Sequence, residues 1–577
     1  MLALWLATPS AWSQSDHSLD TALHQLLEHR CAECHGLHAT KFEKPKKPQL
    51  DLQTDLAALR SNPEYIVPAN AAGSPLFEKV ISTNDEERMP ETTEKNPRDP
   101  LNKEEIALLR QWIEQAPPPT NKFIADSAVL NSIYHDLFSH PAPERSNFRY
   151  LTLHNLANAG DSGEKLEIYR VALNKLVNSL SSRADILNLE PINASKTVLR
   201  LDLRHYGWQP ATWEFVARGY PHAVLRGVRL EDFIARMSGC EVSFVRGDWF
   251  AFAASQAPLY HDIWGMPATE RELERLLNLN VEANIRNGTA QRAGFAKSGV
   301  ANFNRLIERH PQPFGAYWKS YDFAGDKGLR DLFEHPLGPV AMAYRFGFQH
   351  NGGEIIWNLP NGLQAYLLVN AQGQRLNRAP LEIVADPNQP DRAVLNGISC
   401  MGCHFAGIRQ GKHGNLADEV RPAALNALDL NRQEADYMRR LYPEPGAFQR
   451  LAKDDEARFR AALVRVGVSE PRPEEPITIL YNRFLQDITL EHLNSEFGLV
   501  PNVNLLGRLQ DSSNEHLRVL GSRLRAAGSL PRKGFAGEFR LIAETLPIFR
   551  VRTNAQIRYE AFYPTTPVAQ TPGRARP

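Results

Sequence analysis

Two copies of one five-residue pattern constrain this chain more than any other feature. The first copy is Cys31-Ala32-Glu33-Cys34-His35, and the second is Cys400-Met401-Gly402-Cys403-His404. In Cys-x-x-Cys-His, both sulfurs attach to haem vinyl groups and the histidine binds the iron. The sequence therefore predicts two covalently bound haem c groups, attached through Cys31, Cys34, Cys400 and Cys403, with His35 and His404 as axial iron ligands.

Cysteine usage favours this interpretation over its alternatives. Of the five cysteines, only Cys240 lies outside the two motifs. No disulfide within the chain is therefore possible once both haems are attached. A Cys-x-x-Cys pair can also be half of a zinc site or a thiol redox pair. Zinc would need two more Cys or His ligands at each site, and redox pairs normally lack the histidine that follows directly.

Composition and the N-terminus bear on partners and location. The 66 basic residues balance 66 acidic ones, so nothing indicates a nucleic-acid partner. The haem motifs instead make a redox protein the expected partner. No apolar run is long enough for a transmembrane span. Leu2 to Pro9 are apolar and precede Ala11-Trp12-Ser13, which resembles a cleavage site. We interpret residues 1–13 as a truncated signal peptide, which implies export to the periplasm or beyond.

The expected fold is mainly α-helical, with a mixed α/β region in the middle. Residues 14–118 should form a helical, cytochrome c-like haem domain, with one helix running into Cys31 and another over 101–113. Asn102 and Glu105 predict a capping box at the start of that second helix.

Residues 119–425 should form a large α+β domain that ends in the second haem motif. Helical spacing marks 165–182 and 269–279, and 197–203 has the composition of a strand. Asn361-Gly362, between the β-prone runs 354–358 and 363–369, predicts a hairpin. A helical region over 426–563 follows, with helices expected at 457–466 and 477–497, and then a disordered tail over 564–577.

The distal ligand of the first haem can be predicted. Met89, in Glu87-Arg88-Met89-Pro90, is the only methionine between residues 36 and 116. Its Pro-flanked, irregular surroundings suit a loop that crosses the distal face of a haem. A thioether ligand raises the reduction potential, which suits electron transfer.

The distal ligand of the second haem stays open. Met438, the only methionine after His404, lies in a charged helical stretch. His261 and His335 are the best upstream candidates, because each adjoins a carboxylate that could orient its imidazole. An open sixth position is the alternative.

Two family resemblances add to this interpretation. Residues 27–116 resemble the small planctomycete-type cytochrome c domain, through motifs at 31–36, 66–68, 74–76, 87–90 and 101–113. In that family the methionine of the Arg-Met-Pro motif is the expected distal ligand, which implies this role for Met89. The chain departs from the family at Glu91, where a second proline is common.

The rest of the chain resembles bacterial multi-domain di-haem c-type cytochromes. The motifs that carry this second resemblance lie at 333–339, 352–356, 359–363 and 396–400. The resemblance implies a shared fold but no particular reaction.

Three functions agree with these observations. The first is an exported cytochrome for electron transfer. The second is a di-haem oxidoreductase, peroxidase- or oxygenase-like, in which the first haem relays electrons and the second reacts with a small-molecule substrate. The third is a haem-based sensor. No catalytic residue can be named, and the hydrolase Gly-x-Ser-x-Gly and phosphate-loop motifs are absent from the sequence.

Overall fold

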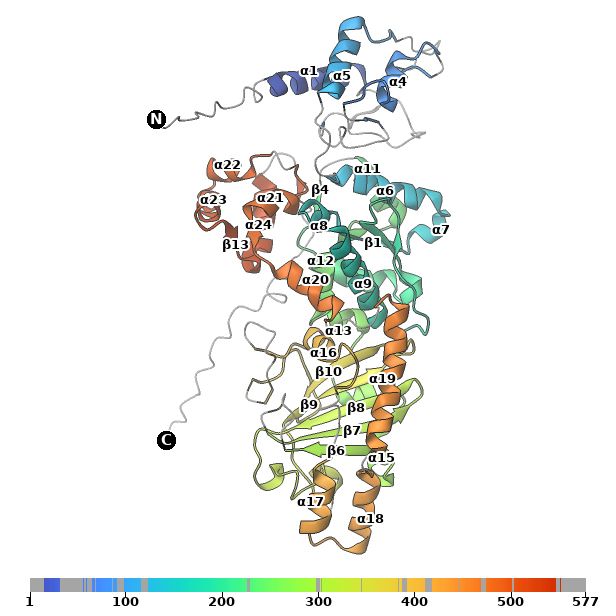
Figure 1. The fold of residues 1–577 in the computed structure, drawn as a ribbon, viewed down its shortest axis with the longest axis vertical. Coiled ribbons are helices and arrows are strands. Elements are labelled where there is room, and N and C mark those ends of the chain that lie inside the picture. The colour runs from blue at the N-terminus through green and yellow to red at the C-terminus, as the bar shows by residue number, and fades with distance from the viewer. Residues whose placement is uncertain are drawn as a thin grey trace, which may run out of the picture.

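The computed structural model describes most of the chain between residues 15 and 551, and its fold is mixed α/β (Figure 1). The described residues are 15–31, 56, 59, 65–67, 69–85, 87–90, 98–115, 123–225, 229–296, 301, 303–343, 345–381, 383–384, 386, 392–409, 418–444, 446–468, 474–500, 503–545 and 550–551. Outside them lie the expected signal peptide, the expected disordered tail, Cys34 and His35.

The N-terminal unit is a small helical body with its own apolar core. Its described helices are α1 (Ser15–Arg30), α4 (Pro75–Ile81) and α5 (Lys103–Glu114). Leu23, Phe77 and Trp112 are among the side chains buried between them. The predicted capping box is confirmed: the Asn102 side chain accepts from the backbone N–H of Glu105 at 2.8 Å, and the Glu105 carboxylate accepts from the backbone N–H of Asn102.

The middle of the chain begins with helices packed around a four-stranded sheet of order β2-β3-β1-β5. The predicted helices at 165–182 and 269–279 and the strand at 197–203 are confirmed as α9, α14 and β3. The elements are α6 (Asp126–Ser139), α7 (Ala142–Arg145), β1 (Phe148–Thr152), α8 (His154–Asn158), α9 (Gly163–Ser179), β2 (Glu190–Pro191), β3 (Val198–Asp202), η1 (Leu203–Tyr206), α10 (Pro210–Gly219), β4 (Val224–Leu225), α11 (Arg229–Ser238), β5 (Phe244–Arg246), α12 (Gly247–Ala254), α13 (Leu259–Trp264), α14 (Glu270–Leu276) and α15 (Val281–Asn287).

A six-stranded antiparallel sheet of order β11-β10-β9-β8-β7-β6 follows. It comprises β6 (Gln291–Phe295), β7 (Arg305–Gln312), β8 (Gly315–Asp322), β9 (Gly352–Asn358), β10 (Gln364–Asn370) and β11 (Arg375–Leu376), with the short helices η2 (Gly328–Arg330) and η3 (Val340–Met342) in the β8–β9 connection. The predicted hairpin is confirmed, since Asn358 pairs with Gln364 across a turn in which Gly362 has φ +90°.

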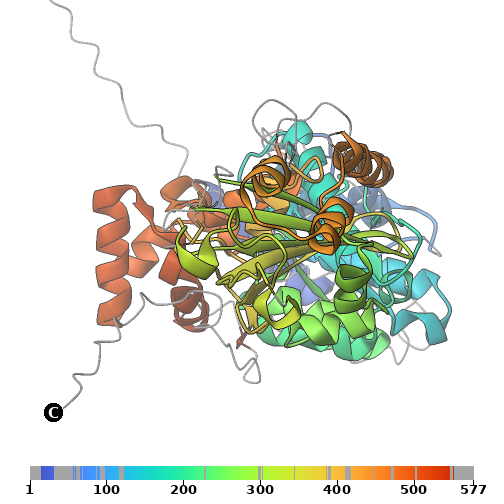
Figure 2. The same cartoon turned by 90° about the horizontal axis from the view of Figure 1, so that it is seen from below.

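Alternating side chains give this sheet two buried faces. Glu308, Lys319 and Ile355 are register neighbours on one face, which α14 covers through an ion pair between Glu270 and Lys319 at 2.9 Å. The opposite face carries Arg309, which α19 covers through Asp455 at 2.8 Å. Figure 2 shows these helices on opposite sides of the sheet.

Five described helices lie along the chain between the six-stranded sheet and the last part of the chain. They are α16 (Ile398–Cys403), α17 (Val420–Ala427), α18 (Arg432–Leu441), α19 (Ala447–Arg465) and α20 (Pro476–Leu485). One hydrophobic core extends from Leu151 to Phe484 and includes buried residues from all five helices and from the six-stranded sheet.

The last part of the chain has a separate core, which extends from Ile488 to Ala543. Its elements are β12 (Ile488–Thr489), α21 (Leu490–Glu496), α22 (Leu505–Gln510), α23 (Glu515–Ala527), β13 (Ser529–Leu530) and α24 (Arg532–Thr545), and β14 (Arg550–Val551) pairs with β4. The expectation of one helix over 477–497 is wrong. The chain leaves the helix after Leu485 because Ile488 and Thr489 pair with β13, and Thr489 then caps α21.

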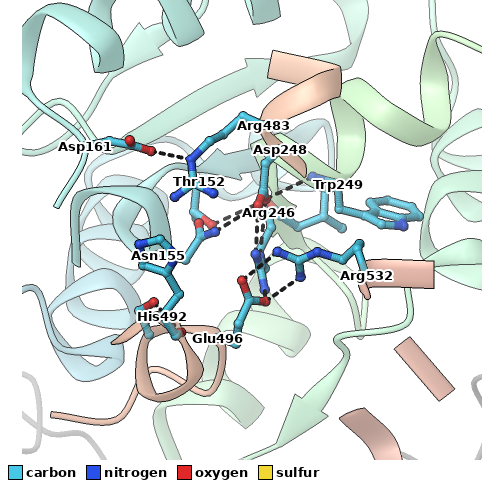
Figure 3. Close-up of polar contacts among 12 residues, drawn as sticks. Thr152, Asn155, Asp161, Arg246, Asp248, Trp249, Arg483, His492, Glu496 and Arg532 are labelled. Atoms are coloured by element: carbon cyan, nitrogen blue, oxygen red, sulfur yellow. Dashed lines mark hydrogen bonds and ion pairs between the residues drawn. The ribbon is translucent and has the colours of Figure 1, made fainter. Parts of the chain in front are cut away.

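A buried row of four charges joins this last part to the middle region (Figure 3). Arg246, at the end of β5, donates to Asp248 at 2.8 Å and to Glu496 at 2.7 Å, and Arg532 of α24 donates to the same Glu496 at 2.8 Å. Burial alone would raise the pKa of Glu496, but the two guanidiniums hold it well below its ordinary range. The C-terminal helices are therefore fixed to the main body by a fully paired ionic contact.

Among the described residues, no helix combines the length and the apolar character that crossing a membrane requires.

Candidate functional site

The described part of the first motif lies where α1 ends. The backbone N–H of Cys31 donates to the carbonyl of Leu27 at 2.9 Å, so Cys31 continues the last turn of the helix. Arg30, one residue earlier, donates to the carbonyls of Asp99 and Pro100 at 3.1 and 2.8 Å. These bonds tie the end of α1 that carries the first motif to the segment that leads into α5.

Met89 belongs to the same small unit. Its backbone N–H donates to the carbonyl of Lys79 at 2.9 Å, which holds the loop against the last turn of α4. Phe77 and Val80, on the buried side of α4, pack into the core that Cys31 also contacts. The loop is thus held to the core of the N-terminal unit, and axial ligation by Met89 remains a prediction.

The second motif forms a short helix that a glycine makes possible. Gly397 precedes α16 with φ +97°, and a Cβ there would lie 2.2 Å from the carbonyl oxygen of Ser255. From this turn the chain enters α16, where Cys400 and Cys403 lie three residues apart and therefore on one side. Cys400 is buried in the main core, and Cys403 is half-buried.

His404 ends α16 and is oriented by two contacts. Its Nδ1 lies 3.1 Å from the carbonyl oxygen of Gly407, and its Nε2 lies 3.4 Å from Oε2 of Glu354. Metal-binding histidines commonly donate one ring N–H to a backbone carbonyl, which directs the other nitrogen at the metal. The ring of Tyr366 is inclined by 30° to that of His404, with 6.3 Å between their centres.

Strand register explains why Glu354 and Tyr366 meet His404. Ile356 of β9 pairs with Tyr366 of β10, and Glu354 shares their face because it is two residues from Ile356. This is the same face that α19 covers.

The carboxylate of Glu354 is ionised. Burial alone would raise its pKa, but His404, a hydrogen bond from Cys400 and the charge of Arg305 lower the pKa to about 2. In the polypeptide this carboxylate pairs with His404, and its Oε2 lies 3.4 Å from Nε2 of the imidazole.

This arrangement fits a haem c in its donors. Two sulfurs lie on one side of a helical turn, and an imidazole held by a backbone carbonyl follows them directly. Burial raises the pKa of both thiols, to about 11 for Cys403.

The two predicted distal histidines lie in different places: His261 lies beside the segment that leads into α16, and His335 lies near β6. His261 of α13 is buried, and its Nε2 pairs with the side-chain amide of Asn396 at 2.8 Å. His335 precedes Pro336, whose carbonyl accepts from Arg292 of β6, three strands from β9. No hydrogen bond or ring contact joins either histidine to His404 in the described structure.

Met438, the only methionine after His404, is buried. It lies on the buried side of α18 and is fully enclosed in the main core. Among the described residues, no group of three or more His, Cys, Asp or Glu side chains has a metal-binding arrangement.

A cavity of about 90 Å³, lined by both apolar and charged side chains, lies elsewhere, beside the buried row of charges. His154, His222 and Phe497 are among the residues that line it. A space of this size holds a few water molecules.

Comparison with known proteins bears on the N-terminal unit. Residues 31–92 match planctomycete cytochrome C. The match begins at Cys31 and includes Met89, so the predicted resemblance of this part of the chain is confirmed, and with it a cytochrome c domain of the type that binds haem c covalently. No curated protein and no solved structure matches the chain.

Sequence reasoning missed Glu354 and Tyr366. Both lie inside the predicted hairpin, where strand pairing alone accounts for their place in the sequence. The available signal was Gly352-Gly353-Glu354, since paired glycines within a strand indicate a close backbone approach. A Cβ on Gly353 would lie 1.9 Å from the carbonyl oxygen of Ser320. That close contact places the backbone of Glu354 firmly against β8.

Proposed function

We propose that this protein is an exported di-haem c-type cytochrome that transfers electrons to or from a redox partner protein. The match of residues 31–92 to planctomycete cytochrome C carries the proposal, because it contains the complete first motif and Met89. In this account His35 and Met89 are the axial ligands of the first haem. His404 is the proximal ligand of the second, which Cys400 and Cys403 attach.

The proposal of a second haem rests on the arrangement of possible ligands around His404. The two cysteines share one side of α16, Nδ1 of His404 is held by Gly407, and Nε2 faces a carboxylate. Haem bound here would supply a one-electron Fe(III)/Fe(II) couple. The protein supplies the attachment, the orientation of the imidazole and the charge around it.

The haem content of the exported holoprotein tests the proposal. We expect intact-protein mass and a haemochrome assay to give two haems per chain. Cys31→Ala/Cys34→Ala and Cys400→Ala/Cys403→Ala should each remove one haem. Cys240→Ala is the matched control, because Cys240 lies outside both motifs, and it should retain two. A wild-type chain with one haem would contradict the di-haem proposal.

A di-haem oxidoreductase is the second candidate, and the surroundings of His404 favour it over a sensor. Met438 is enclosed in the core, and an acidic side chain faces the imidazole instead of a thioether. A haem without a strong-field distal ligand can exchange that ligand for peroxide or oxygen. Peroxide turnover with an electron donor that reduces the first haem would support this candidate, and exclusion of cyanide from both haems would contradict it.

A further inference from the structure

We propose that the cavity of about 90 Å³ between the middle region and the C-terminal helices binds a small primary ammonium ion. This inference goes beyond the proposed electron transfer and depends on neither haem. It rests on three buried polar side chains that line the cavity: His154 and Asn155 at the start of α8, and His222 ahead of β4.

His222 is the strongest indication of a ligand. The residue is 6% exposed, and neither Nδ1 nor Nε2 has a hydrogen-bond partner among the described residues. Burial lowers the pKa of the imidazole well below its ordinary value, so the neutral ring offers one donor and one acceptor. Buried polar atoms are rarely left without partners, so both nitrogens indicate a polar occupant of the cavity.

His154 and Asn155 each add an acceptor. Nε2 of His154 lies 3.2 Å from Oδ1 of Asp126, which holds the ring proton on Nε2 and leaves Nδ1 as an acceptor in the neutral ring. The side-chain N–H of Asn155 donates to Asp248 at 3.1 Å, which leaves Oδ1 as an acceptor (Figure 3). Neither acceptor has a hydrogen-bond partner among the described residues, and the two residues are 7% and 5% exposed. Together with His222 they favour a guest that is rich in N–H groups.

The rest of the lining favours a cation over a neutral guest. Carboxylates of Glu231 and Glu241 line the cavity, and so do the stacked rings of Phe497 and Phe539, whose centres are 4.4 Å apart. Carboxylates and aromatic faces both attract cations. Arg246 is the one arginine among the described lining residues, and two carboxylates already offset its charge.

The volume limits the guest to a few heavy atoms. Since an apolar cavity of about 150 Å³ binds benzene, one of about 90 Å³ admits about four heavy atoms. The n-propylammonium ion has this size, carries a positive charge and donates through its N–H groups. Tetramethylammonium has the charge but no N–H group, and propionate has a similar size with the opposite charge.

Isothermal titration calorimetry of the full chain tests the site with these three probes. We expect n-propylammonium to bind with a Kd of the order of 1 mM, because so small a guest makes few contacts. Tetramethylammonium and propionate should not bind.

Two substitutions in the lining and one outside it locate the binding. His222→Phe keeps a ring but removes both nitrogens, and it should weaken binding at least about tenfold. Ala223→Leu leaves every polar atom in place but fills the cavity, and it should abolish binding. His350→Phe is the matched control: His350 packs edge-on against Tyr321 at 5.0 Å, lies outside the lining and should bind like the wild-type chain.

Stability measurements separate binding from folding. Replacing an unpartnered buried imidazole by a phenyl ring breaks no hydrogen bond, so His222→Phe should be at least as stable as the wild-type chain. If that variant fails to fold, Ala223→Leu decides alone. Binding of n-propylammonium that is lost in the lining variants and kept in His350→Phe would support the site. No binding to the wild-type chain, equal binding of all three probes, or undiminished binding in both lining variants would overturn it and leave the haem proposal intact.

Discussion

The two haem motifs share five-residue chemistry but lie in different structural settings. The first follows α1 in a small helical unit with its own core, and a methionine loop belongs to that unit. The second is one helical turn on the face of a six-stranded sheet, where a carboxylate from a central strand meets the histidine. The comparison teaches that one attachment motif can be carried by two unlike supports: a helical unit that holds a methionine loop and a sheet face that carries a carboxylate.

The largest expected effect comes from removing the methionine that distinguishes the first motif's surroundings from those of the second. Met89→Ala removes the thioether, so the first haem should lose its thioether-to-iron charge-transfer band completely, and its potential should fall. Optical spectroscopy and redox titration of the holoprotein measure both changes. Met438→Leu is the control, since Met438 is enclosed in the core. If the band survives in Met89→Ala, Met89 is not the ligand.

The next effect tests whether the two haem regions unfold independently. Glu308 is fully buried in the large sheet, where it accepts from Arg292 at 2.6 Å and from Tyr321 at 2.9 Å. Glu308→Gln leaves the Arg292 charge uncompensated and should destabilise the sheet domain by about 3 kcal/mol.

Urea unfolding, followed at each haem band, measures this change. Only the second haem should respond to Glu308→Gln. Glu282→Gln is the control: it removes an exposed pair with Arg286 and should cost less than about 0.5 kcal/mol. Equal shifts at both haem bands in Glu308→Gln would show that the regions unfold together.

A smaller effect concerns pH and the sheet domain alone. Burial raises the pKa of Glu274 to about 7, and nearby Lys319 opposes this only in part. Because the folded pKa lies above the unfolded one, stability is full below about pH 4 and declines as pH rises towards 7. Glu274→Gln should remove this decline and gain about 1 kcal/mol at pH 8, a figure reduced for partial solvent exposure. An unchanged stability profile in denaturant titrations across this pH range would contradict the prediction.

The smallest effect uses a matched pair of helix caps, one in each region. Asn102 caps α5 and Asn431 caps α18, both with a capping box completed by a glutamate. Each Asn→Ala change should cost about 1 kcal/mol, because one side-chain bond to a helix N–H is lost. Each loss should appear only in the unfolding transition of its own region. Losses that appear in both transitions would contradict the separation of the two cores.

Local signals made much of the fold predictable. The capping box at Asn102 and the hairpin turn at Gly362 depend on residues within a few positions of each other, and both are confirmed. The helix over 477–497 was wrong because its break depends on a strand forty residues further along the chain: Ile488 leaves the helical path to pair with Leu530.

The candidate site was predictable on one side only. Cys400 and His404 follow from the motif itself. Glu354 does not, because the glycine pair before it indicates a close backbone approach but not which residue its side chain faces. Its position depends on the sheet register and on how α16 packs against β9 and β10, which involves contacts across fifty residues of sequence.

The most direct test of the account is a redox titration of the exported holoprotein with EPR detection. The account predicts two haems per chain: one with a thioether signature that is lost in Met89→Ala, and a second without that signature that is lost in Cys400→Ala/Cys403→Ala. A single haem per chain, or two haems that both show the thioether signature, would contradict the claim that the two motifs hold unequal haems.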